Sequence, residues 1–133
     1  MAGKIVADTL EHSTAGSLDT QYVVNGSAKA WAEIAAGGAS LPDSFNFSSI
    51  DDDGTGEYGL NFTSSMSNAN YSANITITVN HSSGGSSLRY VCIEGKTTSS
   101  VEIDSAYATG STVLFNSYDL ETNANALVHG DLA

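Results

Sequence analysis

The stretch Tyr-Ser-Ala-Asn-Ile-Thr-Ile-Thr-Val-Asn at residues 71–80 alternates apolar and polar side chains without a break. Serine, threonine and asparagine fill every second position, and the apolar side chains between them are Tyr71, Ala73, Ile75, Ile77 and Val79. Successive side chains of a strand point to opposite faces of its sheet. This period of two therefore predicts an antiparallel strand with one buried face and one solvated face.

Shorter forms of the same alternation flank this stretch on both sides. They place apolar residues two apart at Tyr58/Leu60/Phe62, at Val101/Ile103 and at Val113/Phe115. The run at residues 88–93 is more continuously apolar, which predicts a strand covered on both faces. Glycine, asparagine, aspartate or serine bounds each run, as is typical of strands.

Two turns between these runs can be located from their glycines. Asp53-Gly54-Thr55-Gly56 predicts a hairpin, because glycine adopts positive φ at little cost. The segment at residues 82–86 predicts the next hairpin loop. No amphipathic helix stands out, and Val23, Val24 and Trp31 favour extended structure around the alanine-rich residues 28–36.

These patterns predict an all-β protein, an antiparallel β-sandwich or jelly-roll-like domain of about eight short strands. We assign residues 27–133 to that domain and residues 1–26 to a short N-terminal arm. The arm begins with a mixed segment and continues as a chain rich in serine, threonine and glycine. It is either an edge strand of the sandwich or a separate docking segment.

Composition excludes several classes of protein. The chain has 133 residues, with 15 acidic and 4 basic side chains and a formal net charge of −11. So few cations do not form a surface that follows phosphates, so we expect no nucleic-acid partner. No run approaches the roughly 18 apolar residues of a membrane span. The single cysteine gives no intrachain disulfide, and we see no secretory signal.

The sequence contains no recognisable catalytic motif. Its three histidines stand alone among small polar residues, and there is no Gly-x-Ser-x-Gly nucleophile elbow. Carboxylate pairs drawn from Asp104, Asp119 and Glu121 fit acidic loops better than glycoside hydrolysis. We therefore expect no enzymatic activity and no cofactor.

One acidic cluster and three aromatic residues are candidates for binding. Asp51, Asp52 and Asp53 fit a hairpin turn best, with weak Ca²⁺ binding as the alternative. Alternation places Trp31 on one face with charged neighbours, which indicates a subunit contact or a carbohydrate-stacking platform. Tyr107 and Tyr118 lie near expected turns, where they would pack at the rim of the core or line a sugar-binding groove.

Several strings occur in an order that resembles a recurrent domain of bacteriophage tail fibres, of the type common in phages of marine bacteria. They are VNGSAKAW at 24–31, DSFNFSSI at 43–50, DGTGEY at 53–58, NFTSSM at 61–66 and NANY at 68–71. The opening KIVADTL at 4–10 also resembles the start of short phage fibre and tail proteins.

This resemblance implies a virion structural protein made without a signal peptide in the host cytoplasm. Such a protein is a homotrimeric short fibre or fibre tip that contacts other virion proteins and a host-surface glycan or receptor. Docking to the virion would use the arm, with Lys4, Ile5, Val6 and Leu10 as candidates. The alternatives are a capsid decoration protein or head fibre without a receptor role, and a free carbohydrate-binding module. The family supplies no catalytic residues.

Overall fold

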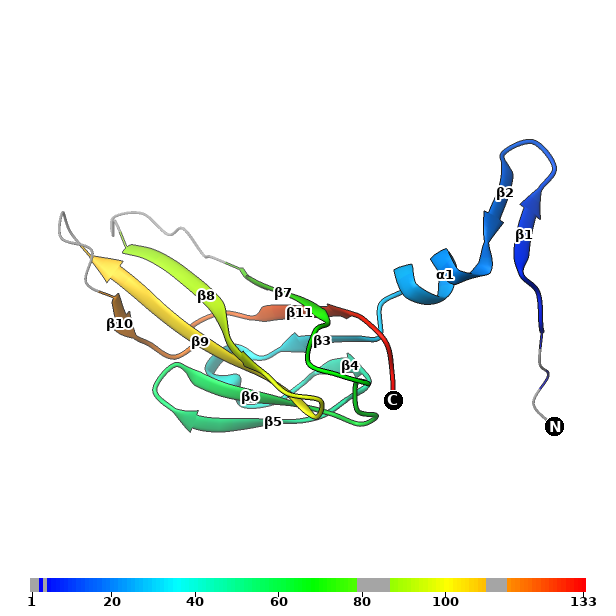
Figure 1. The fold of residues 1–133 in the computed structure, drawn as a ribbon. Helices are drawn as coiled ribbons and strands as arrows, with labels where there is room; N and C mark the ends of the chain where they lie inside the picture. Colours follow the sequence, from blue (N-terminus) through cyan, green and yellow to red (C-terminus); the bar gives the residue numbers. More distant parts are fainter. Residues whose placement is uncertain (1–2, 4, 79–86, 110–114) are drawn as a thin grey trace.

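The computed structural model describes residue 3 and residues 5–78, 87–109 and 115–133. Two antiparallel sheets pack face to face, which confirms the predicted all-β sandwich (Figure 1). The strand order does not confirm a jelly roll. Within the described residues the sandwich has nine strands, namely β3 (Ala30–Ile34), β4 (Asp43–Phe45), β5 (Phe47–Gly54), β6 (Glu57–Phe62), β7 (Ser72–Ile77), β8 (Ser87–Lys96), β9 (Ser100–Thr109), β10 (Phe115–Ser117) and β11 (Ala124–His129).

The first sheet has the order β4-β3-β11-β7. In the second, β9 is central: β8 follows it on one side, and β6 and β10 share the other side, with β5 beyond β6. Ser105 lies on β9 between the residues that pair with β6 and the residues that pair with β10. Its N–H donates to Gly56 O at 2.7 Å, and its carbonyl accepts from Tyr118 N–H at 3.0 Å. The turn after β5 and the chain after β10 therefore meet across β9.

The core packs buried alanines of one sheet, beside Ile34 and Val128 of the same sheet, against large side chains of the other. The four-stranded sheet presents buried alanines at positions 30, 32, 124 and 126. The five-stranded sheet presents Phe47, Tyr58, Leu60 and Phe62, and the rings of Phe47 and Phe62 stack at 5.0 Å. Facing sheets lie about 10 Å apart, so small residues on one sheet leave room for rings on the other.

The alternation that predicted β7 is confirmed over Ser72–Ile77, where the apolar side chains face the core. Val79 and Val113 lie outside the described residues. The expectation that β8 is covered on both faces is wrong, because Cys92 is exposed while Val91 and Ile93 pack against the core. The hairpin loop expected at residues 82–86 lies outside the described residues, and the strands on its two sides, β7 and β8, belong to different sheets.

The first 26 residues fold as a hairpin and a helix that stand away from the two sheets (Figure 1). The hairpin pairs β1 (Thr9–His12) with β2 (Gly16–Asp19), and α1 (Thr20–Gly26) follows directly. This helix was not expected, since valine disfavours it. Lys29 stabilises its C-terminal turn, because the ammonium group donates to the Val24 carbonyl and to Ser27 Oγ.

No helix in the described part of the chain is long and apolar enough to span a membrane.

Candidate functional site

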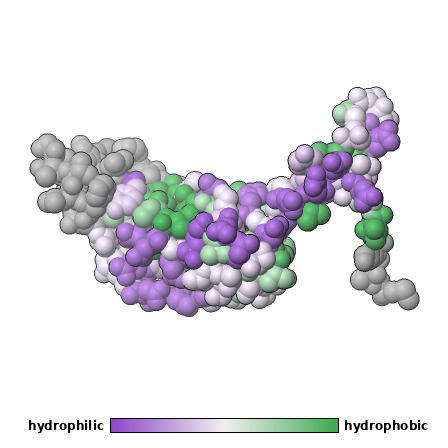
Figure 2. All heavy atoms as spheres, in the orientation of Figure 1, coloured by the Kyte–Doolittle hydropathy of each residue, from purple (hydrophilic) through white to green (hydrophobic). Residues whose placement is uncertain are grey.

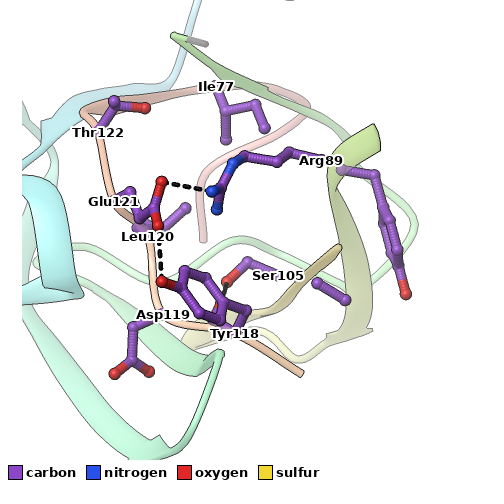
Figure 3. Close-up of a pocket in the computed structure, with 10 residues that line it drawn as sticks. Ile77, Arg89, Ser105, Tyr118, Asp119, Leu120, Glu121 and Thr122 are labelled. Carbon is purple, nitrogen blue, oxygen red and sulfur yellow. Dashed lines mark hydrogen bonds and ion pairs between the residues drawn. The ribbon is translucent and has the colours of Figure 1, made fainter. Parts of the chain in front are cut away.

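A small, shallow recess opens between the two sheets, at the end of the sandwich away from the arm (Figures 1 and 3). Its walls come from β7, β8 and β9 and from residues 118–122, which carry the chain from β10 in one sheet to β11 in the other. Ile77 and Tyr118 lie on opposite sides of the recess, and Arg89 faces Glu121 across it (Figure 3). The recess therefore combines apolar and charged walls.

Buried hydrogen bonds fix segment 118–122 in place. The Tyr58 hydroxyl accepts the Leu120 N–H at 3.2 Å and approaches Asp119 Oδ1 at 3.4 Å. Asp119 Oδ1 also accepts the Gly56 N–H at 2.9 Å, and the Leu120 carbonyl accepts the Gly37 N–H at 2.5 Å. Burial is the main cause that raises the pKa of Tyr58, which keeps its hydroxyl protonated. Leu120 thus anchors this wall of the recess to the core.

Arg89, Tyr118 and Glu121 form a connected group at the recess. Arg89 Nη2 lies 2.5 Å from Glu121 Oε2, and the Tyr118 hydroxyl donates to Glu121 Oε1 at 2.6 Å. The guanidinium also lies 5.0 Å from the centroid of the Tyr118 ring. The hydrogen bond to Glu121 raises the pKa of Tyr118 and lowers that of Glu121, with Arg89 lowering the latter further. The carboxylate is therefore ionised at neutral pH.

The structure brings two of the three aromatic candidates together. The rings of Tyr107 and Tyr118 meet edge to face at 5.0 Å, beside the recess. Sequence reasoning missed Arg89 as their charged neighbour. The available signal was that Arg89 is the only arginine in the chain.

The third aromatic candidate, Trp31, lies elsewhere. It is on the outer face of the four-stranded sheet, and its register neighbours are Phe45 on β4 and Leu127 on β11. All three side chains are exposed, so they form a short apolar row across the sheet. Glu33, on the same strand face, accepts a hydrogen bond from Asn123 Nδ2 at 2.7 Å. The roles predicted for Trp31, a subunit contact or a glycan platform, both remain predictions.

The three consecutive aspartates lie at the end of β5. Asp51 Oδ2 accepts from Asn61 Nδ2 at 2.6 Å, and Asp52 Oδ1 accepts the Gly54 N–H at 3.2 Å. Asp53 Oδ2, Asp51 Cβ and Glu102 Oε2 all lie within 4 Å of where a Cβ on Gly59 would be. Among the residues that the structure describes, no three His, Cys, Asp or Glu side chains are grouped so as to hold a metal ion. Weak Ca²⁺ binding at these aspartates stays an untested prediction.

The N-terminal arm carries a second surface feature, an apolar groove of about 430 Å³ between the chain before β1 and helix α1. Thr20 joins the two parts, since its N–H donates to Asp8 O at 2.8 Å and its hydroxyl to Ala7 O at 2.7 Å. Three docking candidates line the groove, namely Ile5, Val6 and Leu10, together with Ala7, Thr20, Val23 and Val24. The fourth candidate, Lys4, lies outside the described residues.

The arm has no core of its own. Ile5 is 92% exposed and Val6 is 80% exposed. Figure 2 shows apolar surface on the arm, both beneath α1 and along the chain before β1. Seven of its large apolar side chains are solvent-exposed, namely Ile5, Val6, Leu10, Leu18, Tyr22, Val23 and Val24. Contiguous exposed apolar surface of this kind marks interaction sites.

The chemistry of both features is that of binding. The recess offers an aromatic ring, a guanidinium and a carboxylate, and neither histidine nor cysteine is among the described residues that line it. The described residues that line the groove are apolar apart from Thr20. No protein-family model, curated protein or solved structure matches this chain.

Proposed function

We propose that this chain is a bacteriophage virion structural protein, a short tail fibre or fibre-tip subunit that contributes to host-surface attachment. The arm joins the subunit to further copies of the chain and to other virion proteins, and the β-sandwich is displayed outward. The ordered strings that resemble phage tail fibres support the virion assignment. The observation that carries the proposal is the arm, which exposes seven large apolar side chains and buries none.

Such an arm is not stable alone. Its strands have four residues each and its helix has seven. Isolated two-stranded hairpins are marginal in water, and isolated helices need roughly 12–15 residues or more. Packing against a partner would supply the apolar contacts that the arm lacks, and the groove lined by Val6 and Val23 is the natural contact surface.

The positions of the two features suit anchoring and display. The arm joins the sandwich at Lys29, whose N–H donates to the carbonyl of Val128 near the end of β11. The recess lies beside Thr122, just before β11 begins. Since β11 runs from the recess to the arm, docking through the arm leaves the recess at the free end of the subunit.

The test uses tagged full-length chains expressed in cells infected by the phage that carries this sequence. Val6→Asp with Val23→Asp places two charges in the groove, and we expect this variant to be absent from purified particles. Gln21→Asp is the matched control, because it adds charge on an exposed position of α1 outside the groove, and it should be incorporated. A wild-type chain absent from particles would refute the virion assignment.

Immunogold labelling of the same particles separates the two virion roles. Label at the tail supports a fibre or fibre tip. Label over the head supports the alternative, a capsid decoration protein or head fibre without a receptor role.

A further inference from the structure

We infer that the arm of one copy docks on the outer face of the four-stranded sheet of a neighbouring copy, with the side chain of Trp31 seated in the groove between α1 and the chain before β1. The inference rests on the proposed function, in which the arm joins the subunit to further copies of the chain. It names the surface that receives the arm and the residues on both sides of the contact.

The receiving surface is a row of three apolar side chains that the fold leaves uncovered, which we call the Trp31 row. Its members Phe45, Trp31 and Leu127 are register neighbours on the adjacent strands β4, β3 and β11. Their exposed fractions are 52%, 39% and 39%. Ala30 and Ala32, which alternate with Trp31, are buried, so the row lies on the outer face of the sheet. Tryptophan is enriched among the residues that dominate interface energies, which makes Trp31 the anchor of the row.

The arm of the same subunit does not cover this row. Residues 27–29 connect α1 to β3, and hydrogen bonds hold this connection at both ends. The Lys29 N–H donates to Val128 O at 2.8 Å, and the Lys29 ammonium group donates to the Val24 carbonyl. The arm therefore stands away from its own sheets (Figure 1), and a second copy is needed to bring a groove onto a row.

The groove and the Trp31 row are complementary in shape and charge, whereas two rows are not. The groove is a hollow of about 430 Å³, and the row consists of side chains that project from a sheet. Glu33 and Asp43 are register neighbours on the same face as the row. Two rows in contact would bring these carboxylates of two copies together, and like charges disfavour an interface. The described residues that line the groove carry no charge, so a groove adds no such repulsion.

The apolar area of the two surfaces is close to what a stable contact needs. A large apolar side chain buries on the order of 150 Å². With their exposed fractions, the residues of the row and the large residues of the groove together present on the order of 700 Å². A standard interface buries about 1,600 Å² in total, of which roughly 900 Å² is apolar. The groove and the row therefore supply most of the apolar part of such an interface.

The contact joins two different surfaces of one chain, so copies associate head to tail. Each copy offers one groove and one row. A closed ring of copies covers every groove and every row, and the proposed homotrimer is such a ring.

The test is complementation between two full-length variants, measured by sedimentation velocity. Trp31→Ser damages the row and leaves the groove intact, while Val6→Asp with Val23→Asp damages the groove and leaves the row intact. Each variant alone should associate about thirtyfold more weakly than the wild type or worse, and sediment at 13.7 kDa where the wild type assembles. An equimolar mixture should form pairs of about 27 kDa, because the intact groove of the first variant receives the intact row of the second.

Two further variants complete the test. Leu127→Asp, at one end of the row, should behave as Trp31→Ser does and repeats the measurement at an independent position. Tyr22→Ser is the matched control, because it removes an exposed aromatic side chain of α1 that lies outside both the groove and the row. It should assemble as the wild type does. Circular dichroism establishes that each variant is folded.

Three results would overturn the inference. The first is normal assembly of both Trp31→Ser and Leu127→Asp, and the second is a mixture that stays monomeric. The third is normal assembly of the variant with Val6→Asp and Val23→Asp, which would show that the row contacts another row. An assembled wild type with unaffected row variants rejects only this contact, whereas a wild-type chain absent from purified particles rejects the virion assignment.

Discussion

Gly38→Ala is expected to destabilise the sandwich through one clash with the ring of Tyr58. Gly38 has a φ of +62°, which costs an alanine about 1–2 kcal/mol. A Cβ at this position would lie 2.1 Å from Tyr58 Cε1, inside van der Waals contact. Tyr58 is buried and its hydroxyl is held by Leu120, so the ring has no free space to enter. Overpacking of this kind costs about 1–3 kcal/mol more.

The neighbouring glycine provides a matched control. Gly37 has a φ of +74°, and no atom lies within 4 Å of where its Cβ would be. Gly37→Ala therefore carries the backbone cost without the clash. In urea unfolding followed by circular dichroism, Gly38→Ala should lose about 1–3 kcal/mol more than Gly37→Ala at an unchanged m-value. Equal losses would refute the packing of Tyr58 against Gly38, and with it the account of how segment 118–122 is fixed.

Three further predictions test the core and the acidic turn. Burial raises the pKa of Tyr71 to about 12, so the contribution of Tyr71 to the free energy of unfolding should be constant below pH 10 and fall by about 2–3 kcal/mol between pH 10 and 12, and Tyr71→Phe should reduce the fall measured over that range. Leu60→Ala should cost about 3–5 kcal/mol in urea unfolding, because Leu60 is fully buried, and a loss below about 1 kcal/mol would place it outside the core. Millimolar Ca²⁺ or a chelator should leave the thermal midpoint unchanged, because the described residues around Asp51, Asp52 and Asp53 form no group of three carboxylate, histidine or cysteine ligands, and a rise with Ca²⁺ would identify a metal site.

Strands that alternate strictly could be predicted from the sequence because the signal is local. Tyr58, Leu60 and Phe62 fall on one face of β6 whatever that strand pairs with, and all three are buried. Which strand pairs with which cannot be predicted from the local sequence of either strand. Nothing between β7 and β8 shows that the chain leaves one sheet there and enters the other.

The helix α1 and the recess could not be predicted for related reasons. The last turn of α1 depends on Lys29, which lies beyond the helix in the sequence. The ammonium group of Lys29 donates a hydrogen bond to the Val24 carbonyl, and a valine side chain has no such donor. Arg89 and Glu121 meet only because β8 and the segment before β11 belong to different sheets that close over the same core. Tyr107 and Tyr118 were identifiable as candidates from their position near turns, but their contact depends on how β10 pairs with β9.

The native mass of the full-length chain in solution, by light scattering, tests the central claim that the arm buries its groove in an assembly. Three copies of a 13.7 kDa chain weigh about 41 kDa, and we predict that mass for the wild type. The variant with Val6→Asp and Val23→Asp should dissociate, and Gln21→Asp should not. A wild-type chain that remains at 13.7 kDa at every concentration would contradict the account.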